Sequence, residues 1–263
     1  MIRNFEDLWK EHFEYNRGIL LKEIKFLKTV DIYLGNTSDE WYNFALPKTE
    51  PENFDLKEIQ RVLTPVSSSA TVYLLEKYAK LGFPEYLLQN GYEFFGSDTW
   101  MVFDNKAIIN LETSVSVERV NLLNFSDYDQ VTTEVFEEEG FDERPYNRIC
   151  QESLAGVRKS KNPDFSSEFF MIYQDSKPAA GAGLFLTKEI GYFHNDATLP
   201  EFRGKGYHEA LIKKRIDFCL ERGIKTLYSM VEYQKQSFKN YSKCGFESWQ
   251  LAQMFVQKGK DLK

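Results

Sequence analysis

Cysteine and long apolar runs are both scarce in this chain of 263 residues. Its three cysteines, Cys150, Cys219 and Cys244, lie far apart with no histidine at a metal-ligand spacing. This argues against a disulfide framework or a zinc site and favours reduced thiols in a cytoplasmic protein. The apolar stretches are short and interrupted, so we expect no membrane span. Acidic residues occur within the first seven positions, and we expect no secretory leader.

Positive charge is also in deficit. Lysine and arginine number 33 against 40 acidic residues, a net charge of −7, which argues against a general nucleic-acid surface because such a surface needs a basic face. The acid excess lies in residues 1–113, with a net charge of −6, whereas residues 114–263 carry −1. Apolar residues at 42% and charged residues at 28% are typical of a globular protein.

Hydrophobic periodicity predicts strands that alternate with helices. In the first part, strands are expected near 29–34, 41–46 and 99–103, and helices after the capping residue Asp55 and at about 70–81. In the second part, helices are expected near 126–137, 145–158, 206–222 and 236–243, and strands near 115–120, 168–174, 179–186, 190–198, 226–231 and 249–257. The pattern predicts a mixed α/β fold of the α+β type, with a central mixed sheet flanked by helices.

A weak internal echo suggests two related halves. Asn90-Gly91-Tyr92-Glu93 matches Cys244-Gly245-Phe246-Glu247 in type, and each stands where a predicted helix leads into a terminal strand. Chance and duplication both explain such a match. The net charge changes between residues 1–113 and residues 114–263. We therefore predict one domain at 1–113 and another at 114–263, because the second is close to the common domain size of about 150 residues.

The strongest local feature is a glycine-rich segment between a predicted strand and a predicted helix. It reads Leu199-Pro200-Glu201-Phe202-Arg203-Gly204-Lys205-Gly206-Tyr207-His208. Glycines let backbone N–H groups approach phosphate oxygens, and the helix N-terminus adds its dipole. Further positive charge is expected from Arg203, Lys205, Lys213, Lys214 and Arg215. The spacing fits neither a Rossmann motif nor a P-loop, so we predict an anion cradle, with a purely geometric turn as the alternative.

The cradle resembles the acetyl-CoA signature of the GCN5-related N-acetyltransferase (GNAT) superfamily, Arg/Gln-x-x-Gly-x-Gly/Ala. A second block, Gln234-x-x-Ser237-x-x-x-Tyr241-Ser242-Lys243-Cys244-Gly245-Phe246, is similar to the family's Asn-x-x-Ala-x-x-x-Tyr-x-x-x-Gly-Phe. Two residues depart from the pattern: His208 replaces the final small residue of the signature, and Gln234 stands where the family often has asparagine. The resemblance covers residues 114–263 well and residues 1–113 poorly.

The resemblance implies acetyl-CoA as the cosubstrate, without a metal. It assigns acetyl-CoA binding to the end of the strand, the cradle and the second block, at Ala197, Thr198, Leu199, Arg203, Gly204, Lys205, Gly206, Tyr207, His208, Gln234 and Ser237. Backbone groups around Ala197 to Leu199 are expected to hold the pantetheine arm and the acetyl oxygen. The acceptor is expected to be a primary amine of a small molecule or a peptide.

The resemblance also implies that Tyr241 is the general acid that protonates the sulfur, with an aromatic packing role as the alternative. For the base, Tyr192, His194 and Asp196 are two residues apart and are expected to project from one face of a strand. The ordinary pKa of histidine, about 6.5, suits the relay of an amine proton, so His194 is the first candidate, with a histidine merely hydrogen-bonded on the sheet face as the alternative. Asp196 is the second candidate or binds the cationic amine, and Tyr192 is expected to contact the substrate.

Three other features are weaker candidates. The acidic run 137–139 is either a solvated face or a means of steering a cationic amine, and Phe141 beside it could form a wall of the acceptor pocket. His12 and His208 are weaker candidates for the base.

The leading hypothesis is an N-acetyltransferase in which the amine attacks acetyl-CoA directly in a ternary complex. Residues 1–113 would then form a degenerate GNAT-like or accessory domain, because they contain no comparable cradle and Leu87 stands where Tyr241 would be. A non-catalytic acyl-CoA sensor or scaffold of the same fold is the alternative, favoured by His208 and Gln234. Aminoacyl transfer from tRNA is disfavoured by the acidic charge and the intact cradle.

Overall fold

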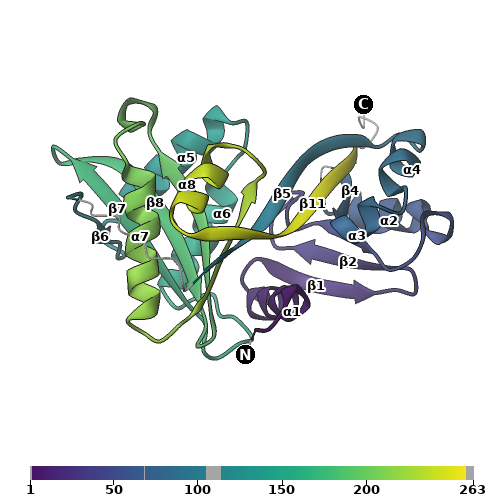
Figure 1. The fold of residues 1–263 in the computed structure, drawn as a ribbon, viewed down its shortest axis with the longest axis horizontal. Helices are drawn as coiled ribbons and strands as arrows, with labels where there is room; N and C mark the ends of the chain where they lie inside the picture. The colour runs from purple at the N-terminus through teal and green to yellow at the C-terminus, as the bar shows by residue number, and fades with distance from the viewer. Residues whose placement is uncertain (1, 68, 105–113, 259–263) are drawn as a thin grey trace. The chain divides into compact units, whose positions relative to one another are not determined.

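The computed structural model describes residues 2–67, 69–104 and 114–258, and its chain divides into two compact units (Figure 1). Unit 1 comprises the residues up to Tyr15 and those from Trp100 to Trp249. Unit 2 comprises Asn16 to Thr99 and the residues from Gln250 onward.

Unit 1 is a mixed sheet with helices on both faces. Its strands follow the order β5-β10-β9-β8-β7-β6, in which β6 to β9 are antiparallel neighbours and β9 and β10 are parallel. The strands are the end of β5 (Glu93–Phe103), β6 (Glu118–Arg119), β7 (Ser166–Gln174), β8 (Lys177–Leu186), β9 (Ile190–Thr198), β10 (Thr226–Glu232) and the start of β11 (Phe246–Lys258). The helices are α1 (Phe5–Asn16), α5 (Phe125–Glu138), α6 (Arg144–Leu154), η2 (Pro200–Phe202), α7 (Tyr207–Leu220) and α8 (Gln236–Lys243).

Both faces of this sheet are covered. Helix α7 packs on one face of β7, β8 and β9, and α5 packs on the other (Figure 1). On the α7 face, the alternate residues Ala180, Ala182 and Leu184 of β8 join the core together with Leu211 of α7. Burial on both faces explains why β8 is apolar almost throughout, since a strand covered on both sides has no solvent-facing residues to alternate with.

Unit 2 has its own strand order, β1-β2-β3-β4-β11-β5. Its elements are β1 (Leu21–Phe26), β2 (Val30–Gly35), β3 (Phe44–Pro47), η1 (Pro51–Asn53), α2 (Leu56–Leu63), β4 (Ser69–Leu75), α3 (Glu76–Ala79) and α4 (Phe83–Gln89), with the remaining parts of β5 and β11. The predicted cap of α2 is confirmed, because the Asp55 side chain accepts hydrogen bonds from the N–H groups of Lys57 and Glu58. The core of unit 2 forms between α2, α4 and the sheet.

One predicted helix is wrong. Residues 70–81 begin with strand β4, and helix α3 occupies only Glu76–Ala79. All seven residues of β4 are buried, and the strand lies inside the sheet between β3 and β11. A strand buried on both faces has no period-two polarity to distinguish it from a buried helix, and the β-branched residues Thr71 and Val72 favour the strand.

The compact units differ from the division predicted at residue 113. The end of β5, from Trp100, lies in unit 1, whereas the end of β11, from Gln250, lies in unit 2 and pairs antiparallel with β4. The first fifteen residues also belong to unit 1. Each unit therefore combines segments that are distant in the sequence, which local periodicity cannot reveal. That residues 1–113 form a degenerate domain stays a prediction.

The internal echo has the same local structure at both places. Gly91 follows α4 with φ 81°, and Gly245 follows α8 with φ 84°. This left-handed conformation ends a helix and favours glycine. The next residues, Tyr92 and Phe246, are buried and lead into β5 and β11. The similarity therefore reflects a shared helix-to-strand exit, which duplication and independent origin would both produce.

Candidate active site at the junction of β9 and α7

Strand β9 loses its partner on one side before it ends. Its parallel pairing with β10 runs from Ile190 to Phe193, while its pairing with β8 continues to Thr198. Ser229 Oγ donates a hydrogen bond to the Phe193 carbonyl at 2.9 Å where the parallel pairing stops. Among the described residues, positions 194–198 thus have no strand partner on the β10 side. An extended ligand that carries amide groups can pair with such an edge.

A β-bulge at Asn195 resets the faces of this strand. Ala197 lies opposite Gly181 and His194 opposite Gly183, so β9 has one residue more than β8 between these pairs. Asn195 takes the extra place with φ 56°. A bulge breaks the strict alternation of side chains, and Asp196 therefore lies on the α7 face. The prediction that Tyr192, His194 and Asp196 share one face is wrong for Asp196.

Asp196 is the centre of a buried polar cluster that we call the Asp196 cluster: Asp196, His208, Arg215 and Tyr241. Arg215 Nη2 pairs with Asp196 Oδ1, and the Tyr241 hydroxyl donates to Asp196 Oδ2 at 2.5 Å. His208 Nε2 lies 3.6 Å from the same Oδ2 atom. Arg215 and Tyr241 have no exposed surface. The cluster joins β9, α7 and α8 at the end of the open strand edge.

The charges of the cluster follow from its contacts. Burial by itself raises the pKa of Asp196, but the Arg215 guanidinium and His208 outweigh it, so that the pKa falls to about 2. Burial raises the pKa of Tyr241 well above its usual range, and the neighbouring Asp196 carboxylate adds to this. The cluster therefore holds an ionised carboxylate, a guanidinium and a neutral phenol whose proton points at the carboxylate.

Arg215 was expected to add charge to the cradle, and this expectation is wrong. Its Nε donates to the Leu211 carbonyl at 3.1 Å and its Nη1 to the Gly183 carbonyl at 2.9 Å. The guanidinium also lies 4.7 Å from the centre of the Phe193 ring. One sequence signal could have found it: Leu211, Arg215 and Cys219 are four residues apart, which places an arginine on the apolar side of the helix.

His194 lies on the opposite face, among aromatic rings. The Tyr146 hydroxyl is 2.8 Å from His194 Nδ1, and the centres of the Phe185 and His194 rings are 4.0 Å apart. Gly183 makes this possible, because an added Cβ there would lie 2.7 Å from His194 Nε2. Burial, together with the Arg215 charge, lowers the pKa of His194 to about 3. The ring is therefore neutral.

The structure also brings the remote His12 to this face. Its ring contacts that of Tyr192 with centres 5.1 Å apart, and its Nδ1 lies 2.7 Å from the Tyr228 hydroxyl. Tyr192 itself stacks on His194. Burial lowers the pKa of His12 to about 3. Tyr192, the predicted substrate contact, is thus part of a buried aromatic layer.

The cradle has the backbone of an anion site. Gly204 and Gly206 have φ 78° and 77°, and no atom lies within 4 Å of a Cβ added at either. Conformation, not crowding, thus favours glycine here. Helix α7 begins at Tyr207, and the N–H groups of its first turn have no partner within the helix. They are available to a phosphate.

The side chains of the cradle reach neighbouring elements. Lys205 Nζ and the Tyr207 hydroxyl both donate to Gln174 Oε1, at 2.8 and 2.6 Å. Arg203 donates to the Thr198 carbonyl at 3.2 Å and pairs with Glu138 at 2.7 Å. Glu138 of the acidic run is thus paired with the cradle, and both side chains of this ion pair are about half exposed to solvent.

The remaining predicted residues lie around this junction. The N–H of Leu199 donates to the Ala179 carbonyl at 3.0 Å, so it is already used by β8. Gln234 is exposed with φ 63° in the turn before α8, a conformation that asparagine adopts more readily. Ser237 lies one turn before Tyr241 on α8. Phe141 is exposed just beyond α5. Their roles in binding stay predictions.

A family model for the acetyltransferase (GNAT) family matches residues 125–246. This range begins at α5, ends at the first residue of β11, and contains β9, the cradle and the Asp196 cluster. Residues 125–246 form a GNAT-family domain. Domains of this family are acyltransferases, and the resemblance read from the cradle and the second block is confirmed.

Solved structures share the fold over nearly the whole chain. A functionally unknown conserved protein from Staphylococcus epidermidis is 16% identical with a TM-score of 0.67, covering 92% of this chain and 96% of its own. A GCN5-related N-acetyltransferase from Kribbella flavida is 13% identical with a TM-score of 0.58, covering 91% of each chain. A tandem GNAT protein from the clavulanic acid pathway is 10% identical with a TM-score of 0.54, covering 89% and 80%.

These likenesses confirm the mixed α/β, GNAT-like fold. At such low sequence identity these likenesses show the fold alone, and they do not identify an acceptor. A search of curated proteins gave no match. Within the described residues, no helix has the length and apolar character needed to cross a membrane.

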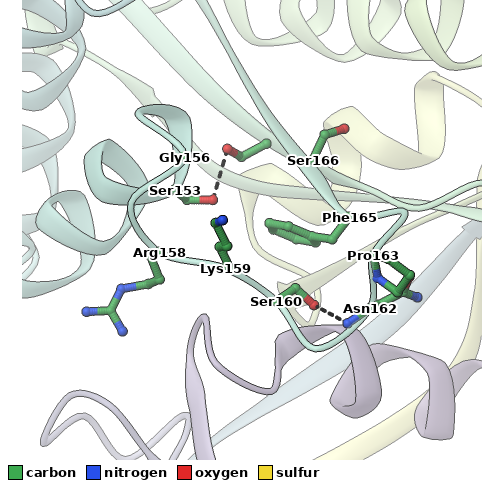
Figure 2. Close-up of a pocket in the computed structure, with 10 residues that line it drawn as sticks. Ser153, Gly156, Arg158, Lys159, Ser160, Asn162, Pro163, Phe165 and Ser166 are labelled. Carbon is green, nitrogen blue, oxygen red and sulfur yellow. Dashed lines mark hydrogen bonds between the residues drawn. The ribbon is translucent and has the colours of Figure 1, made fainter.

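A hollow of about 240 Å³ lies at the other end of β7 from the cradle, in the connection between α6 and β7 (Figure 2). Lys159 points toward Ser153 there, whereas Arg158 points away and pairs with Glu152 at 2.7 Å. Because Gln174, the cradle's partner, is the last residue of β7, this hollow is separate from the candidate site of the GNAT domain.

The contact between Gly183 and His194 predicts a coupled effect on stability. Replacement of Gly183 by alanine should lower the free energy of unfolding of the GNAT domain by about 1–3 kcal/mol, the usual cost of overpacking. In a His194→Ala background the same replacement should cost less than half as much, because the ring that it displaces is gone. Urea denaturation of the wild type, the two single variants and the double variant measures this. Equal costs in both backgrounds would show that the ring is not the obstacle.

The low pKa of Asp196 predicts a loss of stability in acid. A carboxyl group with a pKa of about 2 when folded and about 3.9 when unfolded stabilises the fold well above pH ~4 by roughly 2.6 kcal/mol and loses about half of this by pH ~3. The Asp196→Asn variant should therefore be less stable than wild type at neutral pH, with a difference that shrinks as pH falls. Urea denaturation between pH ~5 and ~3 measures the difference, and a constant difference would contradict the assignment.

Proposed function

We propose that the GNAT domain transfers the acetyl group of acetyl-CoA to a primary amine of a small molecule or peptide, by direct attack of the amine in a ternary complex. The observation that carries this proposal is the continuity of the open β9 edge with the glycine cradle. Residues 194–198 offer backbone groups on the β10 side, and the cradle follows within a few residues. An extended arm that ends in phosphates matches this order.

The residues present fit acetyl-CoA. The space above Gly204 and Gly206 is open, and the N–H groups of the first turn of α7 can receive a pyrophosphate. Lys205 and Arg203 supply positive charge on the exposed side. Acetyl-CoA supplies an acetyl group activated as a thioester. The chain must then orient it, exclude water and deliver a proton to the sulfur.

Tyr241 is suited to the proton delivery. Its pKa is raised well above the usual range, so the hydroxyl carries its proton at neutral pH and can give it to a thiolate. In the structure this proton is directed to Asp196 Oδ2. The hydroxyl must therefore turn from the carboxylate to act. If Tyr241 donates, Arg215 Nη2, 3.5 Å from its oxygen, stabilises the resulting phenolate.

His194 remains the first candidate for the base, but its surroundings limit it to a weak attraction for a proton. Its Nδ1 faces Tyr146, and only Nε2 lacks a hydrogen-bond partner among the described residues. With a pKa of about 3, the ring attracts a proton weakly. We therefore propose that the acceptor amine enters largely deprotonated and that His194 Nε2 orients it. Asp196 is held by Arg215 and Tyr241, which leaves it poorly placed to accept a proton.

A non-catalytic acyl-CoA sensor is the second candidate, and one observation favours it. The Tyr241 hydroxyl is engaged with Asp196, an arrangement that would also serve a purely structural role. Binding without turnover would be its signature.

Acetyl-CoA binding is the first measurement. We expect calorimetric titration to detect binding, and Arg203→Glu to weaken it by about tenfold or more, since it places a negative charge beside the phosphates. Lys188→Glu makes the same change of charge at the turn between β8 and β9, at the far end of β9, and should leave the affinity within about twofold. No binding to wild type, or equal effects of both variants, would refute the cradle assignment.

Turnover is the second measurement. Release of free thiol from acetyl-CoA in the presence of small amines, amino acids and peptides should reveal at least one acceptor. Tyr241→Phe should lower kcat by about 10²-fold or more, the usual contribution of a general acid. Tyr228→Phe is a matched control, because Tyr228 is equally buried but bonds to His12 and Tyr15. Full activity of Tyr241→Phe would remove Tyr241 as the acid.

A further inference from the structure

His208 sends its side chain into the domain, although its backbone belongs to the cradle. It is the second residue of α7, and its ring lies against that of Tyr241 with centres 5.7 Å apart. Its Nδ1 lies 2.8 Å from Asn240 Nδ2. Its Nε2 is buried and has no hydrogen-bond partner among the described residues, with Asp196 Oδ2 at 3.6 Å. An imidazole in place of a small residue thus adds a polar group to the Asp196 cluster.

The neighbours of His208 fix which of its nitrogens carries the proton. Gln236 Nε2 donates to Asn240 Oδ1 at 2.8 Å, so the amide nitrogen of Asn240 faces His208. That nitrogen can only donate, and His208 Nδ1 must accept. The ring proton of neutral His208 is then on Nε2, the atom that faces Asp196. Gln236, Asn240 and His208 form a chain of donors that ends at His208 Nε2, 3.6 Å from the Asp196 carboxylate.

Asp196 Oδ2 needs a donor at every stage of a reaction in which Tyr241 takes part. It accepts the Tyr241 hydroxyl at 2.5 Å, while Oδ1 is held by Arg215. When the hydroxyl turns away, a buried carboxylate oxygen loses its hydrogen bond, and such a loss is costly. His208 Nε2 needs to move by less than ~1 Å to come within ordinary hydrogen-bond distance.

We propose that His208 is a positioning residue whose Nε2–H takes over Asp196 Oδ2 when the Tyr241 hydroxyl turns toward the departing sulfur. This proposal rests on the proposed function. The C–N bond forms and the C–S bond breaks, Tyr241 gives its proton to the sulfur, and the proton lost by the amine returns to Tyr241 through solvent. His208 and Asn240 donate hydrogen bonds and keep their protons throughout.

The charged groups around His208 are already paired. Asp196 is bound to Arg215, and Glu209, the next residue on α7, pairs with Lys243 of α8 at 2.8 Å. Cys244 follows on the α8 side, where burial raises its pKa to about 12, so it stays neutral. None of these neighbours competes with Asp196 Oδ2 for the His208 Nε2–H.

The kinetic test compares two replacements of His208. His208→Ala should lower kcat by about tenfold or more while the Kd for acetyl-CoA and the KM for the amine stay within about twofold. His208→Gln, whose amide N–H can still donate, should recover most of kcat. Wild-type kcat in His208→Ala would overturn the proposal, as would a glutamine variant no better than alanine.

A second measurement needs no turnover. The chain has three histidines, so ¹⁵N spectra of the imidazole nitrogens can be assigned by comparison with His208→Gln. In the protein without acetyl-CoA we expect the neutral ring to carry its proton on Nε2 and none on Nδ1. Asn240→Asp, whose carboxylate can only accept, should move a proton to Nδ1.

The two measurements separate the two proposals. A neutral ring with its proton on Nδ1 in wild type would overturn the donor chain whether or not the protein is active. The expected tautomer together with no turnover for any amine would contradict the proposed function while leaving the hydrogen-bond chain intact.

Discussion

A guanidinium with no exposed surface joins the parts of the candidate site. Arg215 of α7 contacts the Gly183 carbonyl of β8, Asp196 of β9 and the Tyr241 hydroxyl of α8. Removing charged groups from water is expensive, and only good geometry with further hydrogen bonds offsets that cost. Here every nitrogen of the guanidinium has an acceptor. Loss of Asp196 or of Arg215 alone would leave a buried charge, typically a cost of about 3–5 kcal/mol. The Arg215–Asp196 pair therefore holds α7 in position against β8, β9 and α8.

The bulge in β9 lets one strand serve two environments. Asn195 is held on the α5 and α6 side by Tyr128 and Asn147, next to the neutral His194. Asp196 then turns to the ionic cluster on the α7 side. His194 and Asp196 are thus two residues apart in sequence but lie on opposite faces of the sheet, His194 in an aromatic layer and Asp196 beside a guanidinium. Burial disfavours the charged form of both groups: it lowers the pKa of His194, whereas beside Arg215 the pKa of Asp196 still falls and the carboxylate stays ionised.

Much of the fold could be predicted because its elements are local. The glycine cradle, helix α7 and strands β7 to β9 carry their own period and turn residues, and they lie close to their predicted positions. Strand β4 could not be recognised, because burial on both faces removes the alternation that identifies a strand.

The parts of the site that were missed depend on tertiary contacts. The positive φ of Asn195 overrides the period of two on which the shared face of Tyr192, His194 and Asp196 relied. The role of Arg215 depends on a carboxylate nineteen residues earlier in the chain, so charge alone placed it with the surface lysines. The family match adds the class of chemistry, while the acceptor amine depends on side chains whose roles stay predictions.

Strands β5 and β11 each contribute residues to both compact units, and this has a consequence for how the chain folds. The end of β5 is built into unit 1 and the end of β11 into unit 2, so neither unit is complete until residues far apart in the sequence have met. Long-range pairing of this kind slows folding, because loop-closure entropy is lost before the contacts form. During synthesis, unit 2 cannot complete its sheet until β11 has been made. The two halves are therefore expected to reach their native state together.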